Sequence, residues 1–383
     1  MNVLNLTKQL IALPSYVGNG CTEKAVADYL VSYCQQYLPR MSLKKQFIDN
    51  TRYNIILTDG SITKLLLNGH LDTVQPRSGW KTDQLIPTIT DGKMFGLGTA
   101  DMKGNIAAML SALYEIKDSK GVMVLLYVDE EYDFLGMKAF INEYQNKINP
   151  ALIVSGDGTD LQIGNGCRGL IEIRCIAKGL SAHASRPELG INAITGVINA
   201  VNKLTTLLKS KYTDAVLGTT SCNLAFLQGG LDLRSKTTNA TLIGQEGNNV
   251  ADIAEFVLDI RSAHVSLNAG ALTKVLKELL QEEKLILESS TIRHDLGAWV
   301  TKKEELKSIL NVISRPSFAK IGDRGFIDTQ LLWEAFPVPC FTYGAGDGTT
   351  IHKANEYVRI ADLFKAKDTY KKIILALKGG GIL

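Results

Sequence analysis

The chain has 383 residues, with 42 lysine and arginine against 39 aspartate and glutamate side chains, so its formal net charge is only +3. Hydrophobic residues make up 45% and charged residues 21%, which is typical of a globular protein large enough for two or three domains. This charge balance, without basic runs interleaved with aromatic residues, argues against a nucleic-acid partner.

The sequence also argues against a membrane protein. No apolar stretch approaches the roughly 18 residues of a membrane span. The first 15 residues carry leucines at helical spacing and lack a basic start, so we expect an amphipathic helix rather than a signal peptide. The six cysteines form no C-x-x-C pair and predict reduced thiols in a cytoplasmic protein.

Strands and helices alternate in the first part of the chain, which predicts an α/β fold with a mostly parallel sheet flanked by helices. Thr22 is a candidate N-cap for the first long helix, and Asp59-Gly60 indicates a hairpin between two strands. The expected helices are 20–38, 102–117 and 136–144, and the expected strands lie on both sides of Asp59-Gly60, at 121–128 and at 151–155.

The pattern changes after Cys167. Residues 168–179 alternate between apolar and polar side chains, as in an antiparallel strand with one wet face. A helix at 191–210, strands near 221–228, 239–244 and 253–262, a helix at 269–282 and a strand at 285–293 follow. Apart from one additional strand, this β-α-β-β-α-β order is the ferredoxin-like motif, so we expect an inserted α+β domain over 168–297 within a first domain made of 1–167 and 298–383.

Side chains able to bind metal ions follow the predicted strands. In an open α/β sheet, ligands gather beyond the carboxyl ends of the strands. Imidazoles and carboxylates of this kind suit a pair of zinc or similar divalent ions, with one residue left to carry protons. The candidates are His70 and Asp72, Asp101, Glu130 and Glu131, Asp157, and His352.

Each candidate also has a simpler interpretation. Asp101 could be a helix N-cap, Asp157 a turn residue between glycines, and His352 a surface side chain. The metal interpretation is favoured because four of the five positions directly follow buried apolar runs. Asp72, two residues after His70, could orient the imidazole.

The motifs NGHLDTV, GTADMKGNIAA, DEE and a final GxGxxxxxHxxNE resemble those of the M20 family of co-catalytic metallopeptidases and deacylases. That family includes acetylornithine deacetylase, succinyl-diaminopimelate desuccinylase, aminoacylase and carboxypeptidase G2. The resemblance covers nearly the whole chain in order, including the inserted domain.

The resemblance implies two divalent ions, zinc in the first place with cobalt as an alternative. Asp101 would bridge both ions. Glu130 would be the general base that activates a metal-bridging water, and Asp72 would orient His70. The implied ligands are His70 and Asp157 on one ion, and Glu131 and His352 on the other, together with the shared Asp101.

For the inserted domain, the resemblance implies a homodimer in which this domain serves as dimerisation or lid domain. His183, in GLSAHASRPELGINAI, would reach across the interface to stabilise the tetrahedral oxyanion. Asn249 and Arg261 match substrate-contacting positions, although Arg261 could equally pair with Asp259. Arg168 and Arg324 are weaker candidates for substrate contacts, and His264 and His294 are expected to be structural.

Three departures from the family pattern concern the substrate. Leu97 stands where the family usually has Arg, and Ala251 stands in place of a usual Pro. Asp157 is more typical of the peptidases, whereas the DMKG motif resembles the acetylornithine and desuccinylase branch. The cues conflict about the acyl group rather than about the reaction.

The resulting prediction is a co-catalytic di-zinc amidohydrolase that cleaves the amide bond of a small N-acyl amino acid. A dipeptidase or carboxypeptidase of the same family is the alternative. A non-catalytic, metal-binding regulatory dimer is a further alternative, but it predicts at least one missing ligand or base, and the sequence lacks none.

Overall fold

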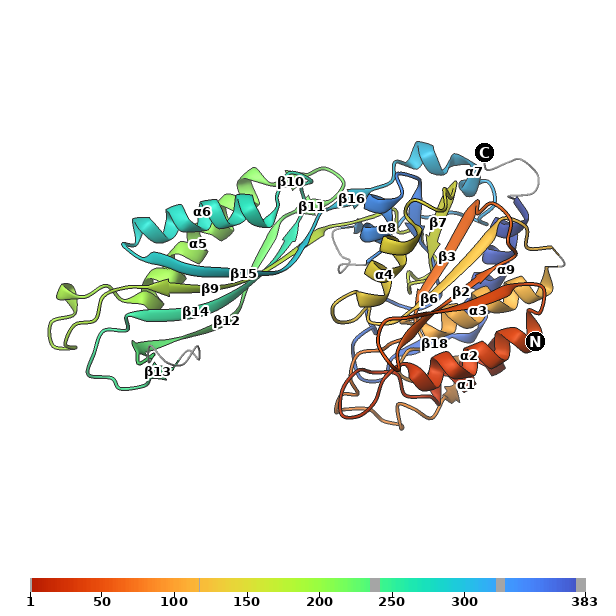
Figure 1. Cartoon of the computed structure of the whole chain (residues 1–383), viewed down its shortest axis with the longest axis horizontal. Helices are drawn as coiled ribbons and strands as arrows, with labels where there is room; N and C mark the ends of the chain where they lie inside the picture. Colours follow the sequence, from red (N-terminus) through yellow and green to blue (C-terminus); the bar gives the residue numbers. More distant parts are fainter. Residues whose placement is uncertain (1, 117, 235–241, 322–327, 377–383) are drawn as a thin grey trace. The chain divides into compact units, whose positions relative to one another are not determined.

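The computed structural model describes residues 2–116, 118–234, 242–321 and 328–376, which form two compact units (Figure 1). The first unit contains the chain up to Asn165, the segment Thr301–Lys320 and the described residues from 328 onward. The second contains Gly166–Val300 together with Ile321. Among the described residues, every helix is too short or too polar to traverse a lipid bilayer.

A six-stranded sheet, ordered β1-β2-β6-β3-β7-β17, forms the centre of the first unit. The strand β3 pairs in parallel with β6 and β7, and β17 pairs in parallel with β7. The antiparallel β1 and β2 complete one edge, so the expectation of a mostly parallel sheet is confirmed. The bounds are β1 Ser42–Phe47, β2 Tyr53–Thr58, β3 Leu65–His70, β6 Val122–Tyr127, β7 Leu152–Ser155 and β17 Cys340–Thr342.

The expected hairpin around Asp59-Gly60 is wrong, because β6 lies between β2 and β3. All six residues of β3 are buried, and a strand buried on both faces gains most from a place inside a parallel sheet. The turn after β2 therefore leads the chain to β3, which lies beyond the position of β6 in the sheet, and does not close a hairpin.

Four helices share one core with this sheet. Leu65 and Leu67 join a core that includes side chains from α1, α2, α3 and α9, whereas Leu66 between them points away from it. The helices α4 and α8 pack against each other elsewhere in the unit (Figure 1). The bounds are α1 Val3–Ile11, α2 Lys24–Tyr37, α3 Lys103–Glu115, α4 Leu135–Tyr144, α7 Lys307–Leu310, α8 Thr329–Ala335 and α9 Ile360–Ala376, with a 3-10 turn η2 at Lys303–Leu306.

The helix α2 begins at Lys24, one residue later than a cap at Thr22 would place it, although the amide of Lys24 lies 3.4 Å from Oγ1 of Thr22. Glu23 occupies the N-cap position and makes no side-chain capping hydrogen bond. Its buried carboxylate instead accepts hydrogen bonds from the Nε and Nη2 atoms of Arg52, at 2.8 and 2.7 Å. The buried, charge-assisted pair of Glu23 and Arg52 is stronger than a hydrogen bond from an exposed capping side chain. The start of the helix therefore depends on a contact with a distant residue, which the local sequence does not show.

A small antiparallel sheet, ordered β18-β5-β4, also belongs to the first unit. It joins a segment near the end of the described chain to one that precedes α3. The bounds are β4 Thr88–Thr90, β5 Lys93–Phe95 and β18 Tyr357–Arg359.

The second unit has the predicted β-α-β-β-α-β order. Its antiparallel sheet is ordered β13-β12-β14-β9-β15, and α5 and α6 pack on it and on each other around a separate core. The ferredoxin-like prediction is therefore confirmed, although part of the predicted strand 239–244 lies outside the described residues. The main bounds are β9 Gly169–Lys178, α5 Ala193–Lys211, β12 Ser221–Asp232, β14 Ile253–Ser262, α6 Ala269–Glu282 and β15 Ile286–Leu296. The short elements are β8 Gly166–Cys167, η1 Pro187–Leu189, β10 Thr213–Asp214, β11 Gly218–Thr219, β13 Ile243–Gly244 and β16 Trp299–Val300.

Candidate metal centre

His70 is the last residue of β3 and is 1% exposed. Its Nδ1 lies 3.1 Å from the backbone oxygen of Asp72 and 3.5 Å from the Oδ1 of the same residue. Its Nε2 lies 3.0 Å from Oδ1 of Asp101. The contact with Asp72 thus orients the ring so that the other nitrogen faces Asp101, and the backbone oxygen is closer than the carboxylate that the sequence suggested.

Asp101, in the loop that enters α3, faces two histidines with its two carboxylate oxygens. Oδ1 lies 3.0 Å from Nε2 of His70, and Oδ2 lies 3.2 Å from Nε2 of His352. These histidines are 282 positions apart in the chain (352 − 70). One carboxylate is therefore shared between two groups of side chains.

The two groups have the composition of metal sites. One contains His70, Asp101 and Asp157, the other contains Asp101, Glu131 and His352, and within each group the ligand atoms lie within 4.8 Å of one another. Three protein ligands of imidazole and carboxylate type leave a coordination position open, as in catalytic zinc sites. The donor set thus fits a pair of divalent cations that share Asp101.

His352 reaches the second group from an exposed loop. Its Nε2 lies 3.0 Å from Oε1 of Glu131, its φ is 61° and its side chain is 45% exposed. The loop is fixed by Asn355, whose Oδ1 accepts a hydrogen bond from the amide of Lys81 at 2.8 Å and whose Nδ2 donates to the carbonyl of Gly79 at 3.2 Å. These bonds hold the histidine at the site despite its exposure.

Asp72 also fixes the two adjacent glutamates. Its Oδ1 accepts a hydrogen bond from the amide of Glu130 at 3.1 Å, and its Oδ2 accepts one from the amide of Glu131 at 2.9 Å. The sequence suggested only a contact between Asp72 and His70. No local signal could have revealed this role, because the bonds join segments 58 residues apart or more.

The histidines gain positive charge readily in the metal-free site. Hydrogen bonds to Asp101 and Glu131 raise the pKa of His352 to about 10. Burial acts to lower the pKa of His70, but its hydrogen bonds to Asp101 and Asp72 outweigh burial and raise that pKa well above its usual value. Burial likewise acts to raise the pKa of Asp101, yet the two histidines hold it below its usual value. A site this rich in carboxylates favours cations.

Glu130 lies beside these groups without belonging to either set of ligands. Burial, followed by the nearby charges of Asp328 and Glu131, raises the pKa of Glu130 well above its usual value, against the effect of His70. Bound cations would oppose this shift, because an opposite charge nearby favours a carboxylate. Glu130 is therefore a carboxyl group whose proton affinity depends on its neighbours, as a proton carrier requires.

Asp328 is a neighbour of the site that the sequence analysis missed. It is fully buried, and the hydroxyl of Tyr127 donates a hydrogen bond to its Oδ1 at 2.7 Å. Burial, together with the charge of Asp157, raises the pKa of Asp328 to about 7. Asp328 follows Tyr127 by 201 residues, so sequence spacing could not have placed it here.

In the second unit, the structure brings together His183 and Asn249, which form an isolated antiparallel backbone bridge. His183 is exposed, and its Nδ1 lies 2.8 Å from Oγ of Ser185. Arg261 pairs with Asp259 through two contacts of 2.9 and 3.0 Å. The ion-pair interpretation of Arg261 is thus the arrangement present.

The remaining candidates differ in their surroundings. Nη1 of Arg168 donates to the carbonyl of Thr219 at 3.2 Å, and its buried Nε has no hydrogen-bond partner among the described residues. His264 contacts Ser266 through Nδ1, and His294 is 7% exposed. Arg324 lies outside the described residues.

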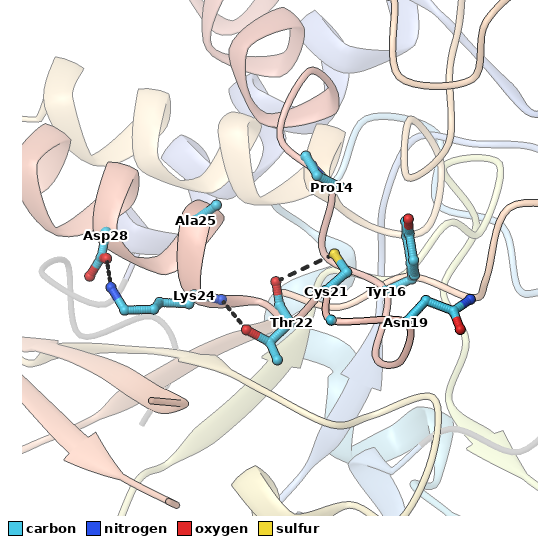
Figure 2. Close-up of a pocket in the computed structure, with 9 residues that line it drawn as sticks. Pro14, Tyr16, Asn19, Cys21, Thr22, Lys24, Ala25 and Asp28 are labelled. Carbon is cyan, nitrogen blue, oxygen red and sulfur yellow. Dashed lines mark hydrogen bonds and ion pairs between the residues drawn. The ribbon is translucent and has the colours of Figure 1, made fainter. Parts of the chain in front are cut away.

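A pocket of about 590 Å³ opens in the first unit, beside the start of α2 (Figure 2). Within it, Lys24 forms an ion pair with Asp28, and the backbone amide of Lys24 lies 3.4 Å from Oγ1 of Thr22 (Figure 2). The pocket contains none of the candidate ligands, but Tyr16 in its wall pairs with Thr73, the residue after Asp72. The lining residues are Pro14, Tyr16, Asn19, Gly20, Cys21, Thr22, Lys24, Ala25 and Asp28.

Comparison with known proteins gives a family match over most of the chain. The family model described as peptidase family M20/M25/M40 matches residues 66–376. An acetylornithine deacetylase of Proteus mirabilis is 33% identical over 241 residues, which cover 59% of this chain and 62% of that protein. The match therefore spans less than two thirds of that relative's length.

Two further proteins resemble the chain over nearly its whole length. A peptidase M20 domain-containing protein of Schizosaccharomyces pombe is 26% identical over 398 aligned positions, which cover 98% of this chain and 84% of that protein. The crystal structure of an M20 family metallo-carboxypeptidase from Sulfolobus solfataricus superimposes with a TM-score of 0.76, at 18% identity and 98% coverage of both chains. The two chains therefore share a fold.

Proposed function

The chain belongs to peptidase family M20/M25/M40, and we propose on that basis that it is a metal-dependent hydrolase of the amide bond in a small N-acylated amino acid. The observation that carries the proposal is the position of Asp101, whose two oxygens face two separate histidines. A shared carboxylate between two groups of ligands is the arrangement that a pair of catalytic cations needs.

The proposed ligands are those of the two groups around Asp101. Zinc is the proposed metal, since imidazole and carboxylate ligands in sets of three suit it, and cobalt is the alternative. When bound, such ions lower the pKa of water and polarise a carbonyl group. His70 and Asp157 would hold one ion, and Glu131 and His352 the other, with Asp101 shared between them.

Glu130 is the proposed proton carrier. Its carboxylate takes a proton from the water that attacks the amide carbonyl and then gives that proton to the leaving amine. Asp72 holds the amide of Glu130 at 3.1 Å, so the side chain starts from a fixed backbone. Glu130 therefore does the acid–base work, while the ligands on either side do not need to change protonation.

His183 is the proposed oxyanion-stabilising residue, acting from the partner subunit of a homodimer formed through the second unit. The proposal is supported by the exposure of His183, which lies on a loop that forms a backbone bridge with Asn249. A hydrogen-bond donor that serves another subunit must be accessible in this way. Asn249 and Arg261 are the proposed substrate contacts. Release of Arg261 from Asp259 would free a guanidinium able to bind a substrate carboxylate through two hydrogen bonds.

A dipeptidase or carboxypeptidase is the second candidate function. Asp157 as a proposed ligand and the similarity to a metallo-carboxypeptidase favour it, whereas the 33% identity to an acetylornithine deacetylase favours the deacylase. The substrates differ in the group on the acyl side of the bond, and the proposed metal chemistry is common to both.

One experiment separates these candidates. The full chain is loaded with Zn²⁺ or Co²⁺ and assayed against N-acetyl and N-succinyl amino acids and against dipeptides. Turnover of the acylated amino acids that is lost with a chelator and restored by metal supports the deacylase. Exclusive turnover of dipeptides favours the second candidate, and two bound ions without turnover of any substrate would favour a regulatory dimer.

A further inference from the structure

Glu356 is a buried carboxylate to which the proposed ligand set assigns no role. It lies four residues beyond His352 (356 − 352), immediately before β18, and is 1% exposed. A carboxylate at such a position needs hydrogen-bond donors, because an unpaired buried charge is very costly. The identity of those donors points to its role.

The donors are backbone amides of the loop that carries Asp101. Oε1 of Glu356 accepts hydrogen bonds from the amides of Ala100 at 2.8 Å and Asp101 at 3.2 Å. Oε2 accepts one from the amide of Gly98 at 3.2 Å. The backbone carbonyl of Glu356 accepts a further bond from the amide of Gly96 at 3.1 Å. Side chain and main chain of one residue thus hold the whole segment that ends at Asp101.

A buried lysine side chain lies near this arrangement. Lys103 is 1% exposed, and its Nζ donates a hydrogen bond to the carbonyl of Leu13 at 2.7 Å. It also interacts electrostatically with Glu356. Burial lowers the pKa of Lys103 to about 7 against the effect of Glu356, while burial and the charge of Asp101 raise the pKa of Glu356 to about 7 against its backbone hydrogen bonds.

We propose that Glu356 is a positioning residue, which aims the two oxygens of Asp101 at the two groups of ligands. A loop held at several amides leaves the Asp101 backbone little freedom. Because Glu356 follows His352 closely, the same side chain also fixes the segment of Asp101 relative to the segment of His352. This inference rests on the proposed function, since it assumes that the two groups bind metal ions.

Two substitutions of similar length test the inference. In Glu356→Gln, the amide oxygen can replace Oε1 and accept from Ala100 and Asp101, while the NH₂ group loses the bond from Gly98. In Glu356→Met, the side chain fills similar space but offers no comparable acceptor. The pair thus separates hydrogen bonding to the loop from the filling of the core.

The first measurement is the binding of Co²⁺ to the metal-free full chain, followed by visible absorption and by the number of ions bound. We expect Glu356→Met to weaken binding up to about 100-fold and to alter the cobalt spectrum, as loss of groups that orient ligands does. Glu356→Gln should retain the spectrum and weaken binding by only about threefold, the effect of one ordinary hydrogen bond.

The second measurement needs no metal. Hydrogen exchange of peptides covering residues 96–101 in the metal-free chain should be about tenfold faster in Glu356→Met than in the unaltered protein, since each freed amide loses its acceptor. Leu30→Ala is the matched control for lost stability, because Leu30 is fully buried in α2 and belongs to the core rather than to this loop. It should lower Tm without a selective change in these peptides or in cobalt binding.

The outcomes distinguish this inference from the proposed function. If the unaltered chain binds no pair of Co²⁺ ions, the proposed function fails, and with it the assumption of the inference. If the unaltered chain binds two ions and Glu356→Met binds them equally well, Glu356 is not a positioning residue. Equal impairment of both variants would also overturn the inference, because the oxygen retained in Gln would then have no effect.

Discussion

The guanidinium of Arg52 lies 2.5 Å from Oδ1 of Asp129, the residue immediately before Glu130. Arg52 also holds Glu23 through two hydrogen bonds, and its own side chain is only 11% exposed. Asp129 has a φ of 72°, and its Oδ2 accepts hydrogen bonds from the backbone amides of Asp133 and Leu135, at 3.2 Å each. A charged cluster of Glu23 and Arg52, which directly precede α2 and β2, thereby supports the backbone that leads to the proposed base.

Arg52→Met is therefore expected to destabilise the protein strongly. The substitution leaves Glu23 and Asp129 buried without their shared cation, and removal of one partner of a buried ion pair typically costs about 3–5 kcal/mol. The free energy of unfolding of the full chain, measured with urea, checks this. Lys44→Met is the control, since its ion pair with Glu143 is exposed and should contribute about 1 kcal/mol or less.

Metal stoichiometry should distinguish the shared ligand from an unshared one. Asp101→Ala removes a donor from both groups, so we expect both ions to be lost on dialysis. His352→Ala affects one group only, so about one ion per chain should remain. Elemental analysis of the dialysed variants gives the answer, and equal metal content in the two would contradict a bridging role for Asp101.

Glu130→Gln should separate catalysis from metal binding. The carboxamide cannot accept the proton of the attacking water, so kcat is expected to fall about 10²–10⁴-fold. The amide of Glu130 can still donate to Asp72, and metal content should not change, because Glu130 belongs to neither ligand group. Activity near that of the unaltered enzyme would remove Glu130 as the base.

His183→Ala should lower kcat about 10²–10³-fold with full metal content, as expected when a donor to a developing oxyanion is lost. Mixing this variant with Glu130→Gln tests action between subunits. If His183 serves the partner's site, mixed dimers contain one site with both functional groups and regain activity. Mixtures that stay as inactive as the separate variants would contradict the dimer proposal.

The second unit should lose stability in acid through Asp232. Hydrogen bonds from Arg234, and further effects of Lys178, hold the pKa of Asp232 below its usual value. The stabilisation is thus present above the unfolded pKa, near 4, and is lost as the pH falls through the lower folded value. At pH 7, Asp232→Asn should lower stability by about 1–2 kcal/mol.

The Tm difference between Asp232→Asn and the unaltered chain should shrink as the pH is lowered from about 5 towards 2. Arg234→Gln is the reciprocal control, because it removes the main cause of the low pKa and should lessen the effect of Asp232→Asn at every pH. A difference in Tm that is constant over this range would show that the charge of Asp232 is not what stabilises the fold.

Local sequence patterns predicted the individual helices and strands better than they predicted which strands lie next to one another. The buried run at 121–128 and the periodic segment at 269–282 correspond closely to β6 and α6, because burial and periodicity act over a few residues. The strand pairs around Asp59-Gly60 could not be predicted in this way. Which strand lies beside β3 depends on β6, whose sequence begins more than 50 residues later.

The candidate site shows the same division. His70, Asp101 and Glu131 could be identified because metal-binding residue types follow strands in recognisable motifs. Asp328 could not, because its significance lies in its bond to Tyr127. Glu356 ends the motif GxGxxxxxHxxNE, but the motif does not reveal that its carboxylate accepts hydrogen bonds from the amides before α3. Such contacts between distant segments leave no periodicity or spacing in the sequence.

The first unit is discontinuous, and this has a consequence for synthesis on the ribosome. Its sheet receives β17 and its core receives α9 only after the entire second unit has been translated. The second unit, which is continuous over 166–300, can fold first as the nascent chain emerges. The earlier part of the first unit must wait with one edge of β7 unpaired, so premature termination before His352 would release a chain prone to aggregation that lacks one member of its second group of candidate ligands.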